Sequence, residues 1–148
     1  MLVWAFSHEK LVFRRALRYR WGSDADVSTN VDVIRREQDV YRRLQPSQDE
    51  QCHGIVNCVG FSSDATQLAY MQNGDLRAYF EKNRPSHSLQ LSWFRQMARI
   101  LDYIHSRRVL VADIASRNFL LASDLSLRLC DFSEASILSP DTDMGSAR

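Results

Sequence analysis

Residues 111–121 read VADIASRNFLL, and residues 131–133, DFS, follow one further apolar run at 127–130. Short apolar runs bounded by polar turn residues are typical of buried strands, so strands are expected at 109–111, 119–121 and 127–130. Four polar residues stand at the ends of these runs: Asp113, Arg117, Asn118 and Asp131. Taken singly, each is an ordinary loop carboxylate, cap or turn residue. Taken together, they indicate a polar cluster where the strands end.

Helical periodicity marks several segments upstream of this stretch. Apolar residues recur on one side of a helical wheel over 31–44, and residues 28–30, Ser-Thr-Asn, offer N-cap oxygens ahead of them. A short helix is expected after the Asn-Gly-Asp break at 73–75, and the clearest helix is expected at 92–107.

Strands are expected at 10–19, 55–61 and 66–71, because apolar and β-branched residues concentrate there between turn residues. The turn Ser123-Asp124 should join the last two apolar runs of the chain into a hairpin. Helices and antiparallel strands in this mixture predict an α+β fold.

Composition limits the classes of partner. The chain has 148 residues, of which 45% are hydrophobic and 25% charged, so it can form a compact core and is not intrinsically disordered. Nineteen Lys and Arg residues against eighteen Asp and Glu give a net charge of +1, so neither nucleic acid nor a membrane surface is an expected partner. The basic stretch at 10–20 could meet nucleic-acid phosphates, but a solvated strand edge is the favoured interpretation.

The cysteines are Cys52, Cys58 and Cys130, an odd number without CxxC spacing. This usage favours a reduced compartment, and we expect an intracellular, cytoplasmic protein. A zinc site at Cys52, His53 and Cys58 is not favoured, because the spacing is irregular and a second ligand pair is missing downstream.

The polar cluster resembles the catalytic loop and metal-binding motif of eukaryotic protein kinases, whose pattern is H-R-D-L-x-x-x-N followed by D-F-G. Asp113 matches the catalytic aspartate, Asn118 the magnesium-binding asparagine, and Asp131 the metal-binding aspartate of the later motif. Arg117 makes the loop more similar to the tyrosine-kinase form than to the serine/threonine form. The segment LRYRW at 17–21 is similar to a divergent group of fungal kinase-like proteins.

The resemblance continues upstream in the family's order. Glu37 matches the helix glutamate that pairs with a strand lysine, and Arg14 stands at the best-matching position for that lysine. Residues 68–76 resemble the gatekeeper, hinge and following helix. The resemblance therefore implies that Leu68 lies behind the adenine and that the backbone of Ala69 and Met71 contacts it.

The function implied by the resemblance is ATP-dependent phosphoryl transfer to the hydroxyl of a protein substrate. Asp113 would accept or orient the hydroxyl proton, with Arg117 and Asn118 in the same catalytic loop. Asn118 and Asp131 would hold Mg²⁺, while Arg14 and Glu37 would replace the usual ion pair that clamps the phosphates.

Several positions depart from the family pattern. The strand lysine is replaced by Arg14, whose planar guanidinium is not equivalent, and the sequence contains no G-x-G-x-x-G. Val111 and Ala112 stand in place of the family's His and Arg, so control by activation-loop phosphorylation is not expected. Ser133 replaces the glycine of D-F-G, which restricts the backbone.

The resemblance implies one partial kinase domain over 1–148, truncated at both ends. Residues 1–71 would form an upper-lobe remnant and hinge, and 72–148 the start of the lower lobe. The alternative is a catalytically impaired pseudokinase or interaction module that binds a partner or a second copy through an exposed lower-lobe surface. A small-molecule kinase of the same fold is the third hypothesis.

Overall fold

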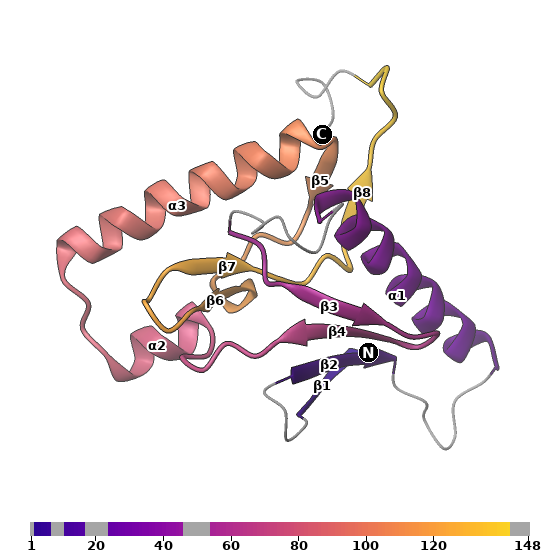
Figure 1. The fold of residues 1–148 in the computed structure, drawn as a ribbon, viewed down its shortest axis with the longest axis horizontal. Coiled ribbons are helices and arrows are strands. Elements are labelled where there is room, and N and C mark those ends of the chain that lie inside the picture. The colour runs from indigo at the N-terminus through magenta and orange to yellow at the C-terminus, as the bar shows by residue number, and fades with distance from the viewer. Residues whose placement is uncertain (1, 7–10, 17–23, 46–53, 143–148) are drawn as a thin grey trace.

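The computed structural model describes residues 2–6, 11–16, 24–45 and 54–142, with side chains described from residue 31 onward. The largest sheet among the described residues has four strands, and Figure 1 shows it between α1 on one side and α2 on the other. The elements are α1 (Asp24–Leu44), α2 (Leu76–Lys82), α3 (His87–Ser106), β1 (Leu2–Phe6), β2 (Leu11–Ala16), β3 (Cys58–Phe61), β4 (Ala65–Ala69), β5 (Val109–Val111), β6 (Phe119–Leu121), β7 (Leu127–Leu129) and β8 (Ala135–Ile137). This mixture confirms the α+β prediction.

The four-stranded sheet is antiparallel, with the strand order β1-β2-β4-β3. Strands form in all three segments where they are expected: β2 lies within 10–19, β3 covers the second half of 55–61, and β4 begins one residue before 66 and ends at Ala69. β1 was not expected, and it forms by antiparallel pairing with β2. The segment at 17–21 that is similar to fungal kinase-like proteins lies outside the described residues.

Helix α1 begins at Asp24, so the expected start near 31 was wrong and residues 28–30 lie within the helix instead of capping it. Residues 24–30 contain no glycine or proline, so nothing in this segment breaks the helix. Gln38 ties α1 to the β3–β4 turn, because its amide nitrogen donates to the carbonyl oxygens of Ser62 and Ala65 at 2.8 and 3.1 Å.

Helix α3 begins at His87, one turn or more before the expected start at 92. The Ser86 hydroxyl accepts a hydrogen bond from the Leu89 N–H and caps this extra turn. The earlier start was missed because residues 87–91 show little helical periodicity of apolar side chains. The expected hairpin forms as β6–β7, and Trp93 Nε1 and the Gln96 amide oxygen bind it through Leu125 O and Leu127 N. None of the helices within the described residues is both long and apolar enough to cross a membrane.

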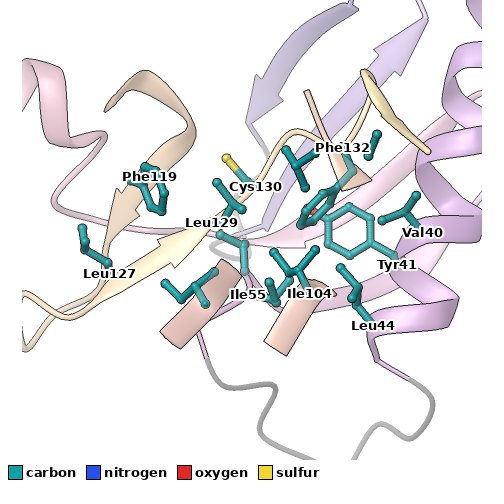
Figure 2. Packing of buried hydrophobic residues seen from close by; sticks show 14 of the residues in the cluster. Val40, Tyr41, Leu44, Ile55, Ile104, Phe119, Leu127, Leu129, Cys130 and Phe132 are labelled. Carbon is teal, nitrogen blue, oxygen red and sulfur yellow. The ribbon is translucent and has the colours of Figure 1, made fainter. Parts of the chain in front are cut away.

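One hydrophobic core joins the two halves of the chain (Figure 2). The ring of Phe132 meets the ring of Tyr41 edge to face, with centroids 5.1 Å apart. Ile104 of α3 and Leu129 of β7 are also fully buried in this core. The residue after Asp131 is therefore fixed to α1, which lies far from it in sequence.

Gly54 brings the chain close to α3. Its backbone has φ of +83°, and a Cβ at this position would overlap Ile100 Cγ1. Its carbonyl oxygen accepts from Leu129 N at 2.7 Å, and Val56 N donates to Leu129 O at 3.0 Å, so residues 54–56 run alongside β7. A residue without a Cβ is needed here for both conformation and space.

The variant Gly54→Ala should lower the free energy of unfolding by about 2–4 kcal/mol, because strain at positive φ adds to overpacking against Ile100. Gly74→Ala is the matched control, since Gly74 also has positive φ but has open space around its Cα. It should cost about 1 kcal/mol. Urea unfolding followed by circular dichroism measures both, and equal losses would contradict the packing role of Gly54.

Candidate functional site

A cavity of about 640 Å³ lies where β4 passes into α2. The expected hinge residues Leu68, Ala69 and Met71 line it together. Leu120 of β6 and Val56 also contribute apolar wall. The structure thus gathers these three predicted residues around one cavity, and Val56 and Leu120 are among the lining residues that were missed.

Leu120 could have been found from its position two residues after Asn118. Strand β6 buries Phe119 and Leu121 on one side, so the alternating pattern leaves Leu120 on the other side, half-buried and facing the cavity. Val56 carries no such signal, because its place depends on the long-range pairing of 54–56 with β7.

The segment expected to form the hinge is tied to the hairpin β6–β7 by main-chain and side-chain bonds. Leu121 N donates to Gly74 O at 2.9 Å, and Asn73 Nδ2 donates to Ala122 O at 2.7 Å. Ala69 N already donates to Asn57 O at 2.8 Å, so only the carbonyl of Ala69 can serve a ligand. The N–H of Met71 has no hydrogen-bond partner among the described residues.

Asp113 is held by two neighbours in its own loop. Arg117 Nη2 donates to both carboxylate oxygens of Asp113 at 2.9 and 2.7 Å. Asn118 Nδ2 donates to Asp113 O at 2.9 Å and to Asp113 Oδ2 at 3.0 Å. The carboxylate of Asp113 is half-exposed, so it is oriented and also accessible.

The loop and the end of β7 are bonded directly. Cys130 N donates to Asn118 O at 2.9 Å, and Cys130 Sγ donates to the same oxygen at 3.3 Å. Asp131 follows with φ of +67°, and its Oδ1 accepts from the hydroxyl and the N–H of Ser133 at 2.7 and 3.3 Å. Asn118 therefore contacts Cys130, the residue directly before Asp131, and a shared metal site at Asn118 and Asp131 stays a prediction.

Glu37 is fully buried, and its Oε1 accepts from Phe132 N at 3.3 Å. A buried carboxyl group requires hydrogen-bond donors, and here the donor is the backbone N–H of the residue that follows Asp131. The side chain of Arg14 lies outside the described residues, although the backbone of Arg14 pairs with Thr66 across β2 and β4. The pairing of Arg14 with Glu37 stays a prediction.

The predicted site residues divide into two neighbouring groups. The walls of the cavity do not include Asp113, Asn118 or Asp131, whereas Arg117 both lines the cavity and bonds to Asp113. Arg117 is therefore the side chain that links the cavity to the polar cluster.

The described cysteines differ in environment. Burial raises the pKa of the Cys58 thiol to about 11, so this thiol stays protonated at neutral pH. Cys130 is buried beneath the loop. Cys52 and His53 lie outside the described residues, and the rest of the chain, as described, contains no group of three or more metal-ligating His, Cys, Asp or Glu residues.

Comparison with known proteins identifies the family. The protein kinase domain model matches residues 21–147, so the chain belongs to the protein kinase family. A probable serine/threonine-protein kinase of Dictyostelium discoideum is 35% identical over 117 residues, covering 78% of this chain and 23% of that relative. The serine/threonine-protein kinase Nek6 of Oryza sativa subsp. japonica is 37% identical over 76 residues, covering 49% of this chain and 14% of that relative.

A putative insulin-like peptide receptor of Hydra vulgaris is 24% identical over 131 residues, covering 77% of this chain and 9% of that relative. The chain thus spans less than a quarter of the length of these relatives. The match to the family model begins after Arg14, so it does not include the strand in which the phosphate-clamping residue is expected.

Asn118→Ala should lower the free energy of unfolding by about 1–3 kcal/mol, because a buried amide that bridges Asp113 to the loop is lost. Arg117→Ala removes a largely exposed ion pair from the same carboxylate and should cost less than about 1 kcal/mol. Denaturant unfolding of both variants beside the wild type measures the difference. A larger loss in Arg117→Ala would show that the loop depends on the ion pair instead of on the buried amide.

Proposed function

We propose that this protein kinase domain binds ATP with Mg²⁺ and transfers the γ-phosphoryl group to a hydroxyl of a protein substrate. The observation that carries the proposal is the convergence of Asp113, Asn118 and Asp131 beside a cavity lined by the hinge. The proposal divides the chain into an upper-lobe part with the hinge, 1–71, and the start of the lower lobe, 72–148.

The hinge end of the cavity suits a purine base. Leu68, Val56 and Leu120 supply apolar surface, while the carbonyl of Ala69 and the N–H of Met71 supply one acceptor and one donor. A planar base with an amino group beside a ring nitrogen can satisfy both groups at once. Mostly apolar walls with a few fixed polar groups are typical of small-ligand sites.

The donor set at the end of β7 fits Mg²⁺, which prefers oxygen ligands. The amide nitrogen of Asn118 is committed to Asp113, which leaves its amide oxygen as the ligand atom. Asp131 supplies a carboxylate on a backbone fixed by the burial of Phe132. When bound, Mg²⁺ would neutralise charge on the phosphates.

Asp113 would accept or orient the proton of the acceptor hydroxyl. The bonds from Arg117 and Asn118 fix the direction of its carboxylate before a substrate arrives, so little reorganisation is needed. Glu37 would act at a distance, by holding Phe132 and through it the backbone of Asp131. Arg14 would bind phosphate in place of lysine.

A pseudokinase or interaction module is the second candidate, and a specific observation favours it. Phe94 of α3 is 66% exposed and Leu91 is 43% exposed, so this helix presents apolar side chains to solvent. The proposed replacement of the strand lysine by Arg14 also favours this candidate. In this case a partner or second copy would bind the exposed surface.

Thermal unfolding with and without ATP and Mg²⁺ tests the nucleotide site. The wild type should be stabilised by about 2.7 kcal/mol at a ligand concentration a hundredfold above the dissociation constant, because the ligand binds only the folded state. Asp131→Asn should lose the magnesium-dependent part of the shift. Asp102→Asn, at an exposed carboxylate on α3, is the matched control and should keep it.

Phosphorylation of a generic protein substrate then separates the two candidates. Wild-type transfer that disappears in Asp113→Ala supports the enzyme. A nucleotide-dependent shift with equal residual phosphorylation in wild type and Asp113→Ala would contradict catalysis and leave the pseudokinase.

A further inference from the structure

The cavity extends past the hinge along α2. Its lining includes Ala78, Tyr79 and Lys82 of α2 and the following Asn83, together with Arg117 of the loop that packs against α2. The residues proposed to hold Mg²⁺ and the phosphates do not line this end. A nucleotide with its base at the hinge and its phosphates at Asn118 therefore leaves the α2 end for a second molecule.

The α2 wall is held firmly. Ala78 N donates to the N-cap carboxylate of Asp75 at 2.8 Å, and both the N–H and the side-chain amide of Asn83 donate to Tyr79 O, at 2.9 and 3.0 Å. The ring of Tyr79 packs edge to face on the buried Trp93, with centroids 5.8 Å apart. These contacts hold the α2 backbone that carries Lys82 in a fixed position beside the cavity.

The charged groups at this end are mainly cationic. The cavity is lined by Lys82, Arg117 and one carboxylate, Asp75, which already caps α2. Glu81, the acid within α2, lies outside the lining and pairs with Arg77 at 3.7 Å. Arg117 bonds to Asp113, whereas Lys82 makes no ion pair within the part of the chain that the structure describes.

We propose that the α2 end of the cavity is an acceptor subsite in which Lys82 selects protein segments with carboxylates beside the acceptor hydroxyl. This inference rests on the proposed function, because it places the acceptor relative to Asp113. Arg117 connects the subsite to Asp113, so a segment bound along α2 has its hydroxyl close to the proposed base. A lysine ammonium is a point charge with three donors and binds carboxylates without a fixed approach direction.

The test compares two peptides that differ only in charge: one with a serine flanked by glutamates and one with glutamines in their place. Their affinities for residues 1–148, with a non-hydrolysable ATP analogue and Mg²⁺ at low salt, are measured by fluorescence anisotropy. The wild type should bind the glutamate peptide about threefold to fivefold more tightly, as expected for one partly exposed charge pair. Lys82→Glu should abolish or reverse this preference.

Arg99→Glu is the matched control, because Arg99 is an exposed cation on α3 that does not line the cavity. It should keep the preference. Equal affinity of the wild type for the two peptides would overturn the inference, and so would equal effects of Lys82→Glu and Arg99→Glu. Loss of nucleotide binding in Lys82→Glu would also overturn it, because Lys82 would then belong to the nucleotide site.

The two proposals fail in different ways. If the wild type shows no magnesium-dependent nucleotide binding, the proposed function fails, whatever the peptides do. If the nucleotide binds but the wild type has equal affinity for the glutamate and glutamine peptides, only the proposal of the acceptor subsite is wrong.

Discussion

The burial of Phe132 against α1 is the constraint on which the rest of the structure depends. The Phe132 ring is fully enclosed and meets Tyr41 edge to face, and its N–H donates to the buried carboxylate of Glu37. Hydrophobic packing and one buried hydrogen bond thus act on the same residue. Together they hold α1 to the end of β7 and fix the backbone of Asp131.

The polar cluster is built outward from this fixed point. Cys130 N bonds to Asn118 O, and Asn118 in turn bonds to Asp113, so a short chain of contacts runs from the core to the half-exposed carboxylate. The hinge is joined to the same hairpin through Asn73. Side chains carried on such a support keep their geometry without a ligand, which the proposed phosphoryl transfer would require.

Local patterns predicted those elements whose own sequence determines them. The apolar face of α3 and the hairpin at Ser123-Asp124 follow from spacing and turn chemistry, and they form as expected. β8 was missed, because it forms only by pairing with the distant β5. The early start of α1 was missed for a different reason, since a polar first turn has no apolar period to detect.

The candidate site shows the same division. Asp113, Asn118 and Asp131 could be nominated as candidates because their motif is compact in sequence, and the structure bonds Asn118 both to Asp113 and to Cys130, the residue before Asp131. Lys82 could not be identified, because it becomes part of the cavity only when α2 packs beside the loop. The relation of Arg14 to Glu37 is still a prediction.

The most direct measurement is paramagnetic broadening of amide signals by Mn²⁺ in the isotope-labelled chain, recorded with and without an ATP analogue. Mn²⁺ accepts the same oxygen ligands as Mg²⁺. If Asn118 and Asp131 hold the metal of a bound nucleotide, broadening should concentrate at 117–119 and 130–133 and should require the nucleotide. Broadening that is unchanged by the nucleotide, or that falls on exposed carboxylates such as Asp39 and leaves the loop unaffected, would contradict the account.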